Sequence, residues 1–582
     1  MRINDMKNFI SWKWPLAALL TMVSIMAHAQ TPARKFNVTG AARGIFFGDR
    51  LDQNVAIEDT ITIPRLNSGH VMADLGLNIR PNKNMEVQGM VRVRNDYGGF
   101  WGSGVTFDIR QMYIKGVIGG VVRYQLGDIN YRMTKYTLWN SDQELLQSTP
   151  TIFRQQYDVL NYDHFYNDDN SWRQQGGATE FGLVFKKYIQ ELQFRAVATR
   201  VRASNNSSTN DRIFGGANIQ LLQSKYFHAG FNYVSLFDVE GTSRNSSIFR
   251  NPVVTGTAKT MWSNEKWSAY AQAELARSKS YYVGNDEAPY KQANASDLEL
   301  NVSNNEWGIS VGATLKRVES DFNSPGAQTK RINYGQLPTA YGRITNEQTV
   351  RQLTIMDLMR ESSLYNLQLQ PYLMNFSPKY DNITPYGDAT PNRQGTIVRA
   401  EWRDKKKNWT VKAEQYMLGE TQGEGTIEAR EFSRTQVGVE FKKDKISEKW
   451  GRMVRVQANF RRDQTTRPGS EFYRGVELNT DVASVGLELE IMEKLDLLVG
   501  WQQVNYNGFD FVSIKDEYAS IFNFQEYSVN GKEIMQAAGL RYRFSEKSFL
   551  SAQWNTFDTQ DATLASTSYK VDQFMLLYQM NF

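Results

Sequence analysis

A two-residue alternation of apolar and polar side chains, running from about residue 36 to the end, constrains this chain more than any other feature. In residues 483–491 every second residue is Ala, Val, Leu or Ile, and Ser, Gly or Glu stands between them. Residues 538–544 repeat the pattern, with Gly and Arg between Ala, Leu, Tyr and Phe. Successive side chains of a β-strand point to opposite faces of its sheet. The sequence therefore predicts an all-β fold whose strands have one apolar and one polar face.

The connections between these runs alternate between short and long. Short turns are expected near residues 81–84, 118–120, 187–188, 223–225, 263–265, 304–305, 404–407, 444–450, 492–493 and 545–547. Longer polar stretches lie between them at residues 49–66, 132–176, 280–293, 322–394, 464–475 and 507–531. Short turns at one end and long loops at the other are typical of an outer-membrane barrel. We expect a transmembrane antiparallel up-and-down β-barrel of about 22 strands, within a range of roughly 18 to 24.

A soluble β-sandwich or propeller is the alternative fold, because its strands also alternate. The chain shows no repeat of fixed period, which a propeller would require. Many of its predicted strands are about 10–13 residues long, which suits a tilted membrane crossing better than the roughly 5–6 residues of soluble sheets. The pattern therefore favours the membrane barrel.

The first 29 residues have the features of a secretory signal peptide. Arg2, Lys7 and Lys13 precede a short apolar run, and the segment ends in Ala27-His28-Ala29. We expect cleavage after residue 29, which leaves residues 30–582 as the barrel domain. The first strand is predicted to begin near Phe36, so the sequence predicts no N-terminal plug domain. Any occlusion of the lumen must then come from loops or from partner proteins. The longest predicted extracellular loops are residues 132–176 and 322–394.

Composition narrows the possible functions. The chain has no cysteine, a formal net charge of +5 and a mean hydropathy of −0.53. Disulfide scaffolds, thiolate metal sites, nucleic-acid binding and helical membrane spans are therefore not expected. Beyond the leader only His70, His164 and His228 remain, and no motif places a nucleophile beside a base. We expect neither an enzyme nor a protein with a cofactor.

The alternation also predicts which charged residues face the lumen. In hydrocarbon the apolar face must meet lipid, so the polar face must point inward. The candidate lumen-lining residues are Arg92, Arg94, Arg399, Glu401, Arg403, Arg455, Arg461, Glu488, Glu490, Arg541 and Arg543. Two interpretations remain open at this point: the arginines focus a field that favours anions, or they pair with the glutamates in ladders that satisfy a polar interior.

The two longest loops carry further hypotheses. In residues 346–360, Val350, Leu353, Met356 and Met359 recur at helical spacing, which predicts a short amphipathic helix that either narrows the lumen or packs as a surface lid. In residues 132–176, carboxylates at Asp163, Asp168 and Asp169 are possible calcium ligands. Aromatic rings of Tyr162, Phe165, Tyr166 and Trp172 are possible sugar-stacking groups. An ordinary solvated outer loop is the favoured interpretation of this second segment.

The last strand ends the chain on Phe582, with Tyr578 and Met580 on the same face, as in the assembly signal of bacterial outer-membrane barrels. Together with the Ala27-His28-Ala29 cleavage pattern and the Tyr- and Asn-rich loops, it resembles porin-like outer-membrane barrels of Bacteroidota. The resemblance is architectural and transfers no catalytic or ligand motif.

The resemblance implies the outer membrane of a Gram-negative cell, with membrane lipid and the barrel-assembly machinery as partners. The predicted function is a porin-like channel for passive diffusion of small polar solutes through a loop-narrowed lumen. The alternatives are a non-conducting structural or assembly subunit of an envelope complex with protein partners, and a surface glycan-binding barrel.

Overall fold

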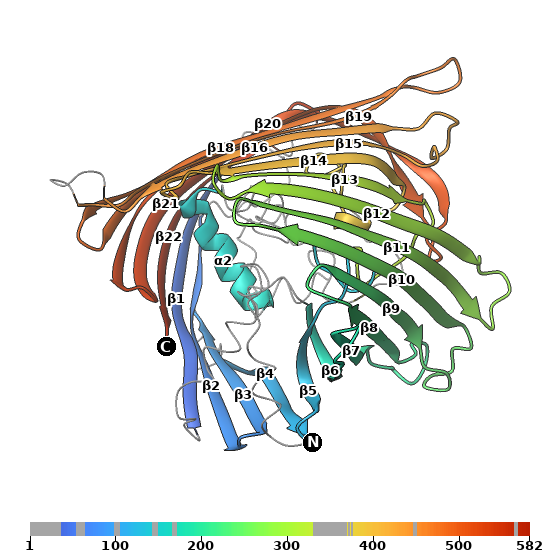
Figure 1. The fold of residues 1–582 in the computed structure, drawn as a ribbon. Helices are drawn as coiled ribbons and strands as arrows, with labels where there is room; N and C mark the ends of the chain where they lie inside the picture. The colour runs from blue at the N-terminus through green and yellow to red at the C-terminus, as the bar shows by residue number, and fades with distance from the viewer. Residues whose placement is uncertain are drawn as a thin grey trace.

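The computed structural model describes residues 36–53, 65–97, 105–141, 149–165, 172–329, 369, 373, 376–445, 451–563 and 568–582. In it, 22 strands form one antiparallel sheet. Each strand pairs with the strands before and after it, and β1 (Phe36–Gln53) pairs with both β2 (Arg65–Asn82) and β22 (Tyr569–Asn581). The sheet therefore closes on itself, and the predicted up-and-down barrel and its strand number are confirmed (Figure 1).

The remaining strands follow in chain order around the barrel. They are β3 (Met85–Asp96), β4 (Val105–Ile118), β5 (Val122–Tyr131), β6 (Trp172–Val184), β7 (Glu191–Arg202), β8 (Arg212–Leu222), β9 (Phe227–Asp238), β10 (Ile248–Ser263), β11 (Trp267–Val283), β12 (Lys291–Asn304), β13 (Ile309–Val318), β14 (Arg393–Arg403), β15 (Trp409–Gly419), β16 (Glu431–Lys443), β17 (Val454–Arg467), β18 (Val476–Met492), β19 (Leu495–Lys515), β20 (Ile521–Ser545) and β21 (Ser548–Asp561). Among the described residues, the connections contain the helix α2 (Thr151–Phe165) and the 3-10 helix η6 (Gly387–Ala389). No helix among the described residues is long and apolar enough to cross a membrane.

The two faces of the wall follow the sequence alternation. On β20, Leu540, Tyr542 and Phe544 are 45%, 42% and 50% exposed, while Arg541 and Arg543 point to the other face and bind carboxylates there. A closed barrel leaves no sheet edge, so its backbone polar groups are paired and its outer side chains are free to be apolar. The outer face is therefore suited to lipid.

Tryptophans gather at the end of the barrel that carries the short turns. Trp267 and Trp307 are exposed on neighbouring hairpins and make an edge-to-face contact with ring centroids 5.9 Å apart. Trp402 and Trp409 flank the turn between β14 and β15 and are 40% and 43% exposed. Aromatic girdles of this kind mark the level at which a barrel meets the membrane surface.

The chain ends close the barrel at the short-turn end. Gly40 N–H donates to the carbonyl of Phe582 at 2.8 Å, and Phe582 N–H donates to the carbonyl of Gly40 at 2.9 Å. The Phe582 ring lies directly over Gly40, where an added Cβ would be 2.7 Å from it. The same Cβ would lie 2.2 Å from the Asp74 carbonyl oxygen on β2, a backbone atom, so this position favours glycine.

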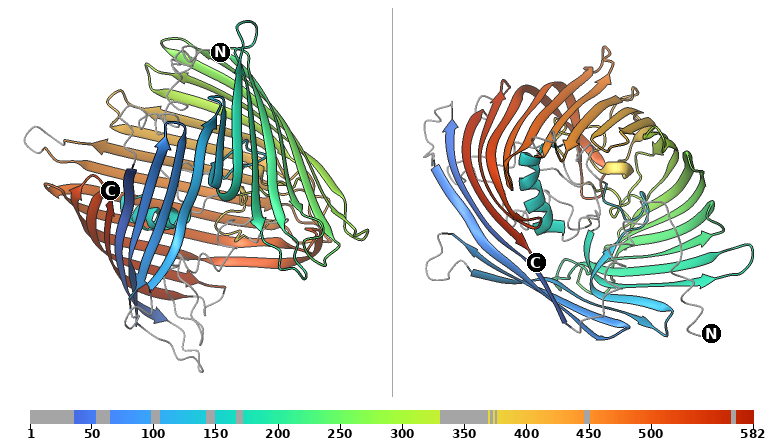
Figure 2. Two further views of the ribbon diagram at one scale, coloured as in Figure 1. Left: turned by 90° about the horizontal axis from the view of Figure 1, so that it is seen from below. Right: turned by 60° about the vertical axis from the view of Figure 1, so that its left-hand side comes forward.

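The polarity of the two faces reverses toward the long-loop end. On β18, Val476, Leu478 and Val482 point inward and are at most 6% exposed, while Glu477 and Asp481 point outward. Apolar side chains can face the lumen there because chain segments fill it. Figure 2 shows α2 inside the ring of strands. The described insertions come from connections between strands.

Candidate functional site

Inward-facing charges form a continuous network on β17 to β20. Glu488 accepts from Arg455 at 3.2 Å and also binds Arg541. Asp496 accepts from Arg541 at 2.8 Å and from Arg543 at 2.9 Å. Each arginine thus spans neighbouring strands, and its charge is met by at least one carboxylate.

Two further carboxylates complete this network. Glu490 accepts from Arg543 at 2.8 Å, and Glu440 lies 3.2 Å from Arg455. The three arginines therefore face four carboxylates, those of residues 440, 488, 490 and 496. The carboxylates therefore balance the charges of the arginines, as the second of the two interpretations, Arg–Glu ladders, predicts. Any anion preference of the lumen stays a prediction, and this part of the wall does not favour it.

The candidate residues on β14 lie in a second group of ion pairs. Arg399 lies 3.5 Å from Glu414 and donates to the Thr314 hydroxyl at 3.2 Å. Glu401 binds Arg403 on the same strand and lies 3.5 Å from Lys412 on β15. Because these groups are partly exposed, the wall here presents both signs of charge to solvent.

The candidates on β3 belong to a buried cluster that includes a helix residue. Arg92 donates twice to Asp74 at 2.8 Å, and Arg110 lies 3.2 Å from the same carboxylate. The Tyr162 hydroxyl of α2 donates to Asp74 at 2.7 Å, and the Arg110 guanidinium stacks 4.0 Å from the Tyr162 ring. Arg94 is buried on the next inward position of β3 at 5% exposure. The cluster fastens α2 to the wall.

The prediction of a solvated outer loop over residues 132–176 is wrong for its central part. Residues 151–165 form helix α2, which lies inside the barrel against β18 to β22 (Figure 1). Ile152 and Phe153 are 1% and 3% exposed and pack in an apolar cluster with Leu498, Met535, Ala537, Phe557 and Val571. The segment folds inward because the wall opposite it carries apolar side chains that burial stabilises.

Two glycines of the wall make room for the start of α2. A Cβ at Gly486 would lie 2.4 Å from the Pro150 ring, and one at Gly500 would lie 2.5 Å from Ile152 Cγ2. Thr151 adds polar contacts, because its hydroxyl donates to Glu488 at 2.9 Å. Glu488 therefore joins the start of α2 to the charge network of β17 to β20.

A second segment, residues 376–392, is bound to the wall at β17, β18 and β20. Lys379 Nζ donates to Glu533 on β20 at 2.9 Å, and the Tyr380 hydroxyl donates to the same carboxylate at 2.8 Å. The predicted lumen residue Arg461 donates to the Tyr380 carbonyl at 2.6 Å, so it holds this segment. Thr480 donates to the Lys379 carbonyl at 2.9 Å.

Asp381 of the same segment accepts a hydrogen bond from a fully buried arginine of the wall. Arg434 on β16 is 0% exposed and donates to Asp463 on β17 at 2.7 Å and to Asp381 at 2.9 Å. Asn382 donates to Asp510 on β19 at 3.0 Å. Breaking one partner of a buried ion pair leaves an uncompensated charge, so these contacts hold the segment firmly in place.

Near the end of this segment, Asp388 of η6 contacts Lys316 on β13. Lys316 Nζ donates to the Asp388 carbonyl at 2.7 Å, and Ser141 donates to the Asp388 carboxylate at 2.9 Å. Burial disfavours the charged carboxylate, but Lys316, Lys135 and Arg399 outweigh it and hold the pKa of Asp388 below its usual range. Asp388 is therefore ionised in the folded protein at neutral pH.

A third insertion combines residues 132–141 with residues 319–329. Tyr136 is 0% exposed and meets Phe322 edge-to-face at 5.7 Å. The Ser324 hydroxyl donates to the Tyr136 carbonyl at 2.7 Å. Around them, an apolar core is formed by Leu138, Phe214, Val234, Leu236, Phe249, Val253, Ala276, Ala293, Ala295, Val318 and Ala327. The lumen thus contains a hydrophobic core of its own on the side of β8 to β13.

Several sequence hypotheses lie outside the described residues. The signal peptide of residues 1–29, the predicted helix of residues 346–360, Tyr166, Asp168 and Asp169 are among them. In the part that the structure does describe, no three His, Asp or Glu side chains are placed to bind a metal. Tyr162 points to Asp74, so its ring is not presented to a sugar at the surface.

Sequence reasoning missed the residues that bind the insertions. Asp74, Arg110, Arg434 and Glu533 face inward on strands and bind α2 or the segment of residues 376–392, and none of them is among the residues predicted to line the lumen. The alternation gives the face of a side chain but not its partner, because these contacts join residues far apart in the sequence: 154 positions for Lys379 and Glu533, and 337 for Thr151 and Glu488.

Comparison with known proteins gives low similarity throughout. No family model matches the chain, and no curated protein matches it. Among solved structures, the P pilus usher (PapC) translocation pore aligns at 8% identity and a TM-score of 0.37, covering 94% of this chain and 100% of that one. OpdO of Pseudomonas aeruginosa aligns at 8% identity and a TM-score of 0.36, covering 95% and 100%. Pseudomonas aeruginosa OccK9 aligns at 10% identity and 0.35, covering 94% and 98%. The fold assignment therefore rests on the strand pairing.

Proposed function

We propose that the protein is a porin-like channel of a bacterial outer membrane, through which small polar solutes diffuse passively. Solute would follow the ion-paired wall of the lumen and pass the insertions that narrow it. The path needs no cofactor and no bound nucleotide. Selectivity would follow the radius of the narrowest passage and the local field of the wall.

One observation carries this proposal: a closed barrel with a lipid-suited outer face has charged, partly exposed side chains on its inner face. Lys115 and Arg123 are 45% and 69% exposed along their side chains and lie beside the turn between β4 and β5, at the short-turn mouth of the barrel. Charged side chains at this mouth are expected where water enters the lumen. Outer-membrane placement is supported by the same apolar face and the tryptophan girdle.

The test is a swelling assay on proteoliposomes that contain the folded full-length protein. Uncharged solutes of increasing size, from a pentose to a tetrasaccharide, are added outside the vesicles. We expect swelling rates that fall steeply with solute size and that do not saturate with concentration. Rates equal to those of empty vesicles for every solute would contradict the proposal.

A second candidate function is favoured by the extent of the inner packing. Three insertions bind the wall through buried ion pairs and an apolar core, which also suits a sealed barrel that serves as a subunit of an envelope complex. In that case the protein would co-purify stably with other envelope proteins and would leave vesicles impermeable. The swelling assay separates this candidate from the channel.

A further inference from the structure

The two ends of the barrel carry opposite charge. The short turns, which follow β2, β4 and every later even-numbered strand, contain 13 Lys or Arg and seven Asp or Glu. The long connections, which follow the odd-numbered strands, contain 12 Lys or Arg and 25 Asp or Glu. The short-turn end is therefore the end suited to an anionic partner.

Five lysines lie together at this end of the barrel. Residues 405–407, all lysines, form most of the turn between β14 and β15 and are exposed. Lys443 and Lys445 lie at the end of the neighbouring strand β16. That end is joined to the turn, because Lys442 N–H donates to the Asn408 carbonyl at 2.7 Å. We call residues 405–407, 443 and 445 the lysine patch.

The carboxylates beside the lysine patch are too few to balance it. Asp404 accepts two backbone N–H groups within its own turn, at 2.7 and 3.3 Å. Asp444 lies 3.5 Å from Lys442, which is not part of the patch and whose charge it balances. Glu448 and Lys449, outside the described residues, cancel in charge. The five lysines of the patch therefore face the one remaining carboxylate of these two turns.

The lysine patch borders the tryptophan girdle. Trp402 and Trp409 flank the turn of residues 404–408, and the Trp409 ring packs against Phe441 with centroids 4.6 Å apart. Phe441 lies two residues before Lys443 on β16, so the two side chains share the outer face of the wall. Tryptophan rings mark the level at which hydrocarbon gives way to headgroups. The lysines follow directly beyond that level, where the phosphates of a leaflet lie.

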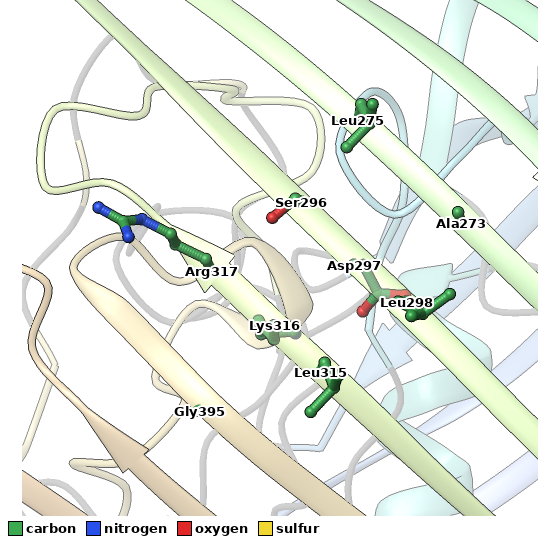
Figure 3. Close-up of a pocket in the computed structure, with 9 residues that line it drawn as sticks. All are labelled: Ala273, Leu275, Ser296, Asp297, Leu298, Leu315, Lys316, Arg317 and Gly395. Atoms are coloured by element: carbon green, nitrogen blue, oxygen red, sulfur yellow. The ribbon is translucent and has the colours of Figure 1, made fainter.

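Nearer the middle of the wall the outer face is apolar. Leu275, Leu298 and Leu315 are 66%, 39% and 54% exposed on three neighbouring strands, β11 to β13. Figure 3 shows these three leucines around a hollow of the wall. Acyl chains are expected along such a surface, with their headgroups at its boundary. The lysine patch lies on the aqueous side of the boundary that the tryptophans mark.

We propose that the lysine patch is a contact surface for anionic phospholipid in the leaflet at the short-turn end of the barrel. The lysine ammonium groups meet the lipid phosphates, and the rings of Trp402 and Trp409 lie beside the first part of the acyl chains. The acidic long connections would repel the same lipid. The surface rests on the membrane placement in the proposed function but not on conduction, so a sealed barrel would bind the same lipid.

The test is native mass spectrometry of the folded full-length protein in detergent, titrated with phosphatidylglycerol and, separately, with phosphatidylcholine. The double variant Lys405→Gln/Lys406→Gln lowers the charge of the lysine patch by two. Arg244→Gln/Arg474→Gln is the matched control, because it removes two exposed cations from the long connections at the other end. An excess of glycerol 3-phosphate supplies the headgroup charge without acyl chains.

We expect phosphatidylglycerol to bind the wild-type protein more tightly than phosphatidylcholine, and glycerol 3-phosphate not to displace it. A lysine near an anionic membrane surface contributes about fivefold in affinity, so the patch variant should weaken phosphatidylglycerol binding about tenfold or more. The control variant should leave it unchanged.

Equal binding of the two lipids by the wild-type protein, an unchanged patch variant or an equal loss in the control would overturn this surface. Displacement of the lipid by glycerol 3-phosphate would overturn it as well, because the patch would then be a site for soluble anions. Impermeable vesicles together with a retained preference for phosphatidylglycerol would remove the channel and leave this surface in place.

Discussion

Lys379 Nζ lies 2.9 Å from Glu533 Oε1, and this contact joins the segment before β14 to the inner face of β20. Glu533 is 1% exposed and also accepts from the Tyr380 hydroxyl. A single carboxylate thus holds two consecutive residues of an insertion that narrows the lumen. Its position on a strand makes it replaceable without changing the insertion itself.

Replacing this carboxylate should release the insertion. We expect Glu533→Ala to lower the free energy of unfolding by about 3 kcal/mol, because the Lys379 charge is left buried without its partner. Trypsin should then cleave after Lys379 faster than in the wild-type protein. Glu526→Ala, an exposed position on the same strand, is the control and should change neither quantity. Unchanged cleavage after Lys379 in the Glu533 variant would show that this contact does not hold the segment.

The contact between Lys379 and Glu533 could be predicted from the sequence only in part. Alternation on β20 assigns Arg541 and Glu533 to the inner face and Leu540 to the outer face, because strand geometry fixes the direction of every second side chain. The number of strands followed from the same pattern and from the turns. The inward folding of α2 did not, since its sequence is as polar as that of a surface loop, and its burial depends on apolar residues of β19 to β22 that are hundreds of positions away.

The start of α2 should be displaced by a side chain at Gly500. A leucine there would overlap Ile152 and Phe153, and overpacking of this kind costs about 1–3 kcal/mol. The chain contains no cysteine, so Gln155→Cys, at another buried position of α2, provides a single reporter thiol and leaves Ile152 in place. We expect maleimide labelling of that thiol to be about tenfold faster in the Gly500→Leu background.

Gly256→Leu is the matched control for this labelling experiment. Gly256 also lies within a strand, on β10, but nothing is within 4 Å of an added Cβ there. Labelling of the reporter thiol should remain slow in that background. Equal rates in both leucine variants would mean that α2 is not held by its packing at Gly500.

Charge removal on β20 should change the ion selectivity of the lumen. The double variant Arg541→Gln/Arg543→Gln leaves Glu488, Glu490 and Asp496 without these two arginines. We expect the reversal potential in a salt gradient to shift toward cation selectivity. Arg200→Gln/Arg462→Gln on the outer face should leave it unchanged. A conducting protein whose reversal potential does not move in the inner-face variant would place the solute path away from these arginines.

The contribution of Asp388 to stability should depend on pH in one direction. Its pKa is below the usual value of 3.8 in the folded protein, because Lys316, Lys135 and Arg399 outweigh the effect of burial. The stabilisation is therefore complete above the unfolded pKa and is lost as pH falls through the lower, folded value. We expect the difference in thermal midpoint between wild type and Asp388→Asn to be constant from about pH 8 to 5 and to shrink below about pH 4. A difference that grows on acidification would contradict this account.

Single-channel recording of the folded full-length protein in a planar bilayer tests whether the lumen conducts. Folding is first verified by the change in gel mobility on heating. We expect stepwise, stable conductance without added nucleotide, and a larger step in the Glu533→Ala variant, whose insertion is released. A silent bilayer with correctly folded protein, in both the wild type and that variant, would contradict the channel and leave a sealed envelope subunit.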